Sequence, residues 1–133
     1  MLKCNWKAVV ASALLFAFPY ALVVLLTGVL VQSESTRMLF AFVAYATFPV
    51  IVALIAVGYI AARLAGASGV ANGAAAGLLL AFVLLAGPYV SFNIDMYWLE
   101  YIRVYGPHAL VMGVFWCSLG GLIRELLREF RMA

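Results

Sequence analysis

Long stretches without a charged residue constrain this chain more than any other feature of its sequence. The stretches cover residues 8–31, 38–62, 64–94 and 104–123. Charged residues make up only 10% of the chain, whereas they make up roughly 25% of an average soluble domain. Uncharged apolar stretches of about 18 residues or more are typical of helices that cross a membrane. The sequence therefore predicts an all-α, polytopic integral membrane protein.

The spacing of these stretches predicts one membrane domain, residues 1–133, organised as a four-transmembrane-helix bundle. Each span needs about 20 apolar residues, so four spans occupy most of the chain and leave no room for a soluble catalytic domain. The predicted spans cover about residues 7–31, 38–64, 70–90 and 107–123, and a charged helical tail covers 124–133.

The connection before the last span, residues 91–106, is less polar than a typical loop. Its apolar residues recur at helical spacing and are Ile94, Tyr97, Trp98, Tyr101, Ile102 and Tyr105. This pattern predicts an amphipathic helix that lies in the membrane interface, where Tyr and Trp are enriched. The helix could anchor the chain to the membrane surface or contact a partner, and Tyr97, Trp98 and Tyr101 are the candidate contact residues.

The basic residues predict the orientation, because cytoplasmic loops carry an excess of Lys and Arg. With the N-terminus inside, six of the eight basic residues lie on the cytoplasmic side and two lie outside. The six are Lys3, Lys7, Arg63, Arg124, Arg128 and Arg131, and the two are Arg37 and Arg103. We therefore expect a multi-pass protein of the cell membrane with both termini in the cytoplasm. The basic residues are too scattered for nucleic-acid binding, so the expected partner is the lipid bilayer.

Glycines recur every fourth residue at the start of the third predicted span, at Gly69, Gly73 and Gly77. This spacing places them on one helix face, where another backbone can approach closely. We expect tight helix packing there, either within the chain or with a second copy. Asn72, beside this face, could hydrogen-bond across the hairpin or to backbone carbonyls. Arg63, which ends the second span, could reach lipid phosphates or a specific partner.

The hairpin between the second and third spans reads GYIAARLAGASGVANGAAAG over residues 58–77. It resembles the central hairpin of a group of small prokaryotic four-helix membrane proteins of unknown function. Those proteins carry a similar G…A/G-R…G-x-x-x-G-x-x-x-G pattern between their second and third spans. The resemblance covers this hairpin and the four-span plan, and it implies no activity.

The residues that usually carry membrane chemistry are missing from the predicted spans. No acidic, basic or histidine residue lies deep in any span, although proton-coupled transporters usually need one there. The single histidine, His108, cannot supply a pair of haem ligands, and Cys4 and Cys117 do not form a C-x-x-C pair. The sequence also lacks clusters of metal ligands. We therefore expect no catalytic residue, no cofactor and no metal site, and we interpret both cysteines as free thiols.

These observations favour a non-catalytic role as a small structural or accessory subunit that packs through its glycine faces with itself or with a larger membrane complex. The alternative is a small homo-oligomeric channel or transporter, built around helix kinks at Pro19 and Pro49 near the middle of the first two spans. A membrane enzyme is a more distant third. The tail, 124–133, has an apolar stripe that could lie on anionic lipid or dock to a partner.

Overall fold

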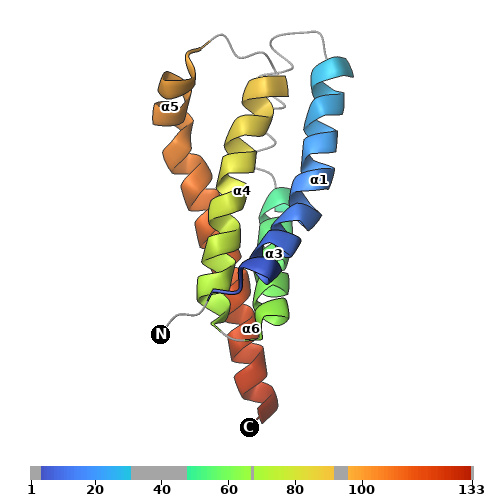
Figure 1. Ribbon diagram of the computed structural model, residues 1–133, viewed down its shortest axis with the longest axis vertical. Helices are drawn as coiled ribbons and strands as arrows, with labels where there is room; N and C mark the ends of the chain where they lie inside the picture. Colours follow the sequence, from blue (N-terminus) through green and yellow to red (C-terminus); the bar gives the residue numbers. More distant parts are fainter. Residues whose placement is uncertain (1–3, 31–47, 67, 92–95, 133) are drawn as a thin grey trace.

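The computed structural model describes residues 4–30, 48–66, 68–91 and 96–132. All regular secondary structure in these residues is helical, with no strand among them, so the all-α class is confirmed (Figure 1). The helices are α1 (Trp6–Leu30), α3 (Phe48–Ala65), α4 (Gly69–Ser91), α5 (Trp98–Leu110), the π-helical turn η1 (Val111–Phe115) and α6 (Trp116–Met132). The last three follow one another without a break, and together they are called the last helix, Trp98–Met132.

Among the described residues, three helices are long and apolar enough to cross a membrane, namely Trp6–Leu25 within α1, Gly69–Gly87 within α4, and the last helix. They overlap the first, third and fourth predicted spans and fit the predicted membrane location. The second predicted span is only partly described, because residues 38–47 lie outside the described part of the chain. Its described part contains the shorter apolar helix Val50–Ala65. The count of four spans therefore stays a prediction.

The last helix differs from its prediction. A separate interfacial helix is predicted before a span that starts at Pro107, whereas the structure has one helix that starts at Trp98 and contains Pro107. Buried residues occur all along this segment, which packs against α4: Tyr101, Gly106, Ala109, Met112 and Gly113. A continuous buried face favours a continuous helix, even though a proline removes one backbone hydrogen bond.

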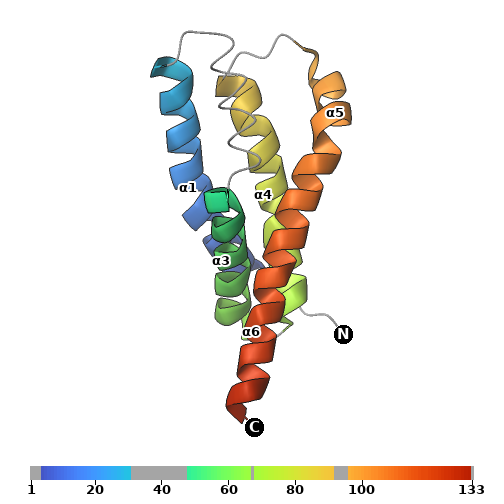
Figure 2. The same cartoon turned by 180° about the vertical axis from the view of Figure 1, so that it is seen from behind.

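The described helices pack side by side, with α4 in contact with α1, α3 and every part of the last helix. Figures 1 and 2 show α4 between α1 and the last helix, and α3 beside the half of the bundle where α4 begins. At that end α6 extends beyond the other helices. The start of α4 and the end of the last helix therefore lie at the same end of the bundle.

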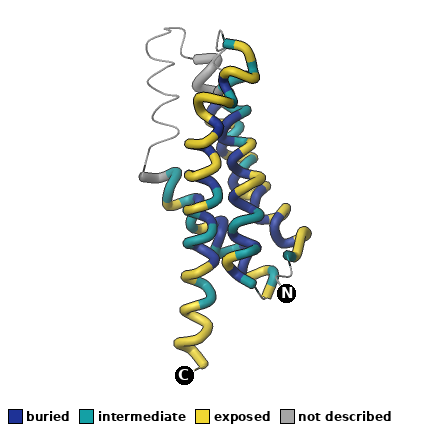
Figure 3. The backbone as a smooth tube through the Cα atoms, turned by 90° about the vertical axis from the view of Figure 1, so that its left-hand side faces the viewer, coloured by how far each residue is buried: buried dark blue, intermediate teal, exposed yellow. Residues whose placement is uncertain are grey.

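The core is apolar, and so is much of the outer surface. Large side chains that are fully or almost fully buried come from all parts of the bundle and include Val9, Leu54, Leu80 and Tyr101. Large apolar side chains also lie exposed, and Phe18 on α1 is 75% exposed. Figure 3 shows exposed positions along the outside of the helices. Soluble proteins rarely expose large contiguous apolar patches, whereas lipid covers such a surface in a membrane protein.

Pro19 and Pro49, the predicted helix kinks of a channel or transporter, lie at different places in their helices. Pro19 lies inside α1, which continues through it, and its side chain is exposed. Pro49 is the second residue of the described α3, and its side chain lies outside the described part of the structure. A central cavity between two facing kinks therefore gains no support from Pro19.

Candidate functional site

A close helix contact joins α4 to the last helix, and we call it the glycine seam. The facing pairs, in antiparallel order, are Gly69 with Gly121, Gly73 with Cys117, and Gly77 with Gly113. A Cβ atom added at any of the three α4 glycines would lie under 3.0 Å from a backbone carbonyl oxygen of the last helix. Real Cβ atoms essentially never approach so closely, so this contact requires glycine on α4.

Small residues four positions apart on both helices explain why the seam forms. The spacing keeps two rows of small residues face to face, and close backbone packing drives helix association in lipid, where the hydrophobic effect does not. The α4 glycines thus face the chain's own last helix, which is one of the two possibilities that their spacing left open. This face is not available to a second copy.

The same part of the last helix also packs against α3. Gly120 lies against the carbonyl oxygen of Ile55, and Gly58 lies against the carbonyl oxygen of Cys117. Cys117 is a free, fully buried cysteine whose backbone also faces Gly73. Its surroundings are helix backbone rather than the partly exposed, electropositive setting of a reactive thiol. We interpret Cys117 as a small packing residue at the point where three helices meet.

Sequence reasoning missed the half of the seam that the last helix contributes. Gly113, Cys117 and Gly121 are small residues four positions apart, the same signal that Gly69, Gly73 and Gly77 carry on α4. That pattern is readable within the predicted fourth span. Pairing the two rows would have predicted an antiparallel contact between the third and fourth spans.

Asn72 joins the starts of two helices. Its side chain is fully buried, its Nδ2 donates a hydrogen bond to the Ser68 carbonyl oxygen at 2.9 Å, and its Oδ1 accepts one from the Asn5 backbone N–H at 2.8 Å. Asn5 precedes α1, and its own Oδ1 lies 3.4 Å from the Ala8 backbone nitrogen, as in an N-cap. Of the two predicted partners of Asn72, a backbone carbonyl is the one observed, that of Ser68. The other bond joins Asn72 to Asn5, directly before α1.

The tail of α6 packs against the turn between α3 and α4, and we call this region the polar end. Arg128 Nη1 donates a hydrogen bond to the Gly66 carbonyl oxygen at 3.1 Å. Glu125 Oε1 lies 3.3 Å from the Val70 backbone nitrogen, in the first turn of α4. A carboxylate is favourable there because the unpaired N–H groups of a helix start carry partial positive charge. Glu125 and Arg128, on the polar side of the tail, thus bond to the chain's own bundle.

A cavity of about 300 Å³ lies at the polar end. Its lining combines small residues of the turn with charged residues of the tail: Ala62, Gly66, Ser68, Gly69, Arg124, Glu125, Arg128, Glu129 and Met132. Arg63 does not line this cavity. Its side chain is exposed and makes no hydrogen bond or ion pair with the described residues, so it is free to reach lipid phosphates.

At the opposite end, four aromatic side chains form a cluster between α4 and α5. The ring centroids of Tyr89 and Trp98 lie 4.8 Å apart, and those of Tyr89 and Tyr101 lie 4.9 Å apart; Tyr101 also packs against Tyr105 at 5.0 Å. The Tyr101 hydroxyl donates a hydrogen bond to the Leu85 carbonyl oxygen at 2.8 Å. The cluster holds the start of the last helix on α4.

The three predicted contact residues of this region therefore have different positions. Tyr101 is 1% exposed and belongs to the core, and Trp98 is partly buried in the cluster. Tyr97 is 83% exposed and points away from the core. Of the three, only Tyr97 presents most of its surface to lipid or to a partner.

The described residues bring together no group of three or more His, Cys, Asp or Glu side chains that could hold a metal ion. His108 lies on the exposed side of α5, and Cys4 is partly buried near the start of α1. The arrangement offers close helix packing, a charged cavity at one end and an aromatic cluster at the other. Comparisons with protein-family models, curated proteins and solved structures returned no match.

Proposed function

We propose that this chain is a non-catalytic integral membrane protein that serves as a small structural or accessory subunit of a larger membrane complex. In this proposal it has four spans, the second lying within residues 38–64, and both termini are cytoplasmic. The resemblance of residues 58–77 to the hairpin of small prokaryotic four-helix membrane proteins agrees with this plan. It assigns no activity.

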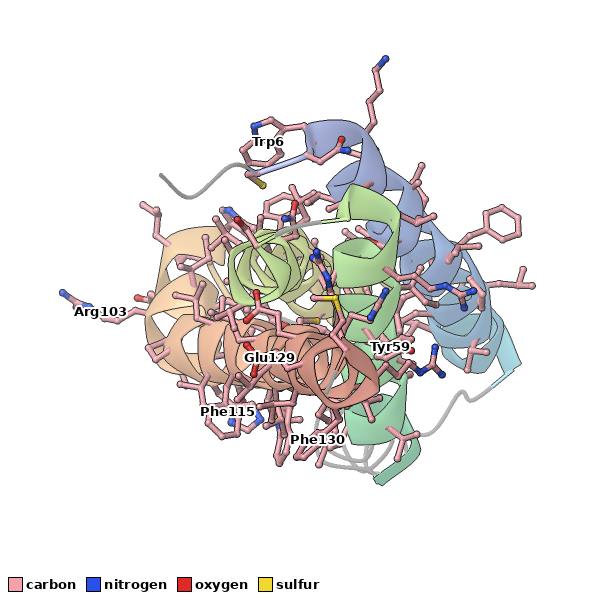
Figure 4. The ribbon with its side chains drawn as sticks, turned by 90° about the horizontal axis from the view of Figure 1, so that it is seen from below. Trp6, Tyr59, Arg103, Phe115, Glu129 and Phe130 are labelled. Carbon is pink, nitrogen blue, oxygen red and sulfur yellow. The ribbon has the colours of Figure 1, made fainter. Side chains whose placement is uncertain are left out.

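The observation that carries the proposal is an exposed apolar face along the last helix. This outer face consists of Val111, Phe115, Leu122, Leu126 and Phe130, which are 40–76% exposed. Figure 4 shows Phe115 and Phe130 on the side of the last helix away from α4. The glycine faces hold the chain itself together, so we assign association with a partner to this outer face instead.

The length of the last helix shows why the hydrocarbon core does not cover the whole of this face. Its 35 residues extend over about 52 Å at about 1.5 Å per residue, whereas the hydrocarbon core is about 30 Å thick. The polar end holds the tail in line with the bundle through Glu125 and Arg128. Leu126 and Phe130 therefore project beyond the hydrocarbon core, where a protein partner would cover them.

A photo-crosslinking side chain placed at position 130 tests the proposal in cells. Phe18 is the matched control, because Phe18 is 75% exposed and Phe130 is 76% exposed. We expect a discrete adduct with another membrane protein from position 130 and only lipid adducts from position 18. Lipid adducts alone at both positions would contradict the proposal. A dominant adduct between two copies of this chain would favour the homo-oligomeric channel or transporter instead.

A further inference from the structure

The cavity at the polar end carries an unusual arrangement of charge. Arg124 and Arg128 lie four residues apart on α6, and so do Glu125 and Glu129. Each pair brings two like charges to neighbouring positions on the helix surface, which is unfavourable for a helix by itself. No ion pair joins these four side chains to one another or to any other described residue. The cavity therefore offers two cations and two carboxylates that do not neutralise each other directly.

One nitrogen atom of Arg124 lacks a hydrogen-bond partner in the described part of the chain. The Nε atom of Arg124 is buried and has no hydrogen-bond acceptor among the described residues. A buried guanidinium N–H without an acceptor is costly, so native proteins rarely leave one unpaired. Glu125 and Arg128 are already oriented by bonds to backbone atoms of Val70 and Gly66. The cavity is thus preorganised, and its charged groups keep hydrogen-bonding capacity for a ligand.

The depth of the cavity indicates which ligands can reach it. The uncharged stretch of the last helix, residues 104–123, rises about 30 Å, which matches the thickness of the hydrocarbon core, about 30 Å. Arg124 follows this stretch directly. The cavity therefore lies at the level of the lipid headgroups, where phosphate and amine groups are abundant.

We propose that this cavity binds a zwitterionic headgroup that combines a phosphate with a primary ammonium, as in phosphatidylethanolamine. Arg124 and Arg128 hold the phosphate through charge-assisted hydrogen bonds, and Glu125 and Glu129 hold the ammonium. A purely anionic headgroup would leave two carboxylates facing it. A quaternary ammonium has no N–H to donate. This inference does not depend on the accessory role proposed above.

Native mass spectrometry of the full chain tests the site. The protein is released from nanodiscs that contain equal amounts of phosphatidylethanolamine and phosphatidylcholine, with phosphatidylglycerol as the third lipid. We expect phosphatidylethanolamine to be retained about tenfold more than phosphatidylcholine, the ratio for about 1.4 kcal/mol. Equal retention of these two lipids, or stronger retention of phosphatidylglycerol, would overturn the proposal.

Three variants locate the binding. Arg124→Gln and Glu129→Gln should each abolish the preference, whereas Arg131→Gln, at an exposed position outside the cavity lining, should keep it. Figure 4 places Glu129 on the α4 side of the last helix. Because Glu129 is exposed, Glu129→Gln should fold, and this variant tests the site if Arg124→Gln fails to fold. Loss of the preference in Arg131→Gln, or its survival in Glu129→Gln, would overturn the assignment.

A competition with free O-phosphoethanolamine distinguishes the two sources of this headgroup. Displacement of the retained lipid by the free compound would show that the headgroup chemistry alone is recognised. Retention of phosphatidylethanolamine despite an excess of the free compound would assign the site to the membrane lipid.

Discussion

Gly73 shows at the residue scale how this protein packs. It lies on α4 against the backbone of Cys117, and a Cβ atom at this position would overlap the Cys117 carbonyl oxygen. Because that neighbour is helix backbone rather than the end of a flexible side chain, relief requires a whole helix to shift. A single methyl group at Gly73 would therefore disturb the packing of α4 against the last helix along the glycine seam.

We expect Gly73→Leu to lower the free energy of unfolding by about 2–3 kcal/mol, the upper part of the range for overpacked sites. Ala11→Leu introduces the same side chain at an exposed position of α1 and should change stability by less than about 0.5 kcal/mol. Leu79→Ala, on a residue 37% exposed, should also cost less than Gly73→Leu. Unfolding in mild detergent titrated with SDS measures all three. A Gly73→Leu protein as stable as Ala11→Leu would show that the seam is not closed in the native state.

The last helix shows at the element scale how a helix keeps one face on its neighbour over a long distance. Its buried small residues fall four apart, at Ala109, Gly113, Cys117 and Gly121. In an α-helix with 3.6 residues per turn, such a row drifts by about 40° at each step. The π-helical turn η1, with i→i+5 hydrogen bonds, accommodates an extra residue and counteracts this drift. The widened turn thus keeps Gly113 and Cys117 facing α4.

The tail of the last helix should protect the first turn of α4 from solvent exchange. The Val70 N–H has Glu125 as its acceptor, so Glu125→Ala leaves it without one. We expect hydrogen exchange at Val70 to accelerate about fivefold, which corresponds to about 1 kcal/mol for one hydrogen bond. Glu129→Ala, one helical turn further and without a backbone bond, is the matched control. Equal exchange rates at Val70 in both variants would show that the tail does not hold the start of α4.

At the scale of the whole molecule, the distribution of charge predicts how the protein is oriented in the membrane. Charged residues of the last helix gather at its two ends, with Glu100 and Arg103 near its start and the Arg and Glu residues of the tail at its end. An apolar surface lies between them. Because the polar end carries most of the basic residues of this helix, the excess of Lys and Arg on cytoplasmic sides predicts that this end faces the cytoplasm.

Labelling of single cysteines tests this orientation. In a variant without Cys4 and Cys117, we expect a membrane-impermeant thiol reagent to label Glu100→Cys in intact cells and Glu129→Cys only after lysis. Both positions are exposed and lie at opposite ends of the last helix, so accessibility is matched. The reverse pattern would place both termini outside and would contradict the distribution of basic residues.

The candidate sites were predictable to different extents. Gly69, Gly73 and Gly77 could be found because a four-residue repeat of glycine has a direct geometric meaning on one helix. The cavity at the polar end could not be found from the sequence. Its lining combines Gly66 in the α3–α4 turn with Arg124 in the tail, and no local sequence pattern predicts that these two segments meet. Tyr101 was predicted as a contact residue, yet it is buried, since aromatic spacing does not reveal which face of a helix packs on α4.

The sequence by itself determined the all-helical class, the apolar segments suited to a membrane and the existence of a glycine face on α4. These properties follow from composition and from periodicity within single segments, which act over a few helical turns. Only the tertiary structure decided that the glycines face the last helix, that Pro107 lies inside a continuous helix and that the tail closes over the α3–α4 turn. Those outcomes depend on which helices come into contact, and such contacts join residues far apart in the chain.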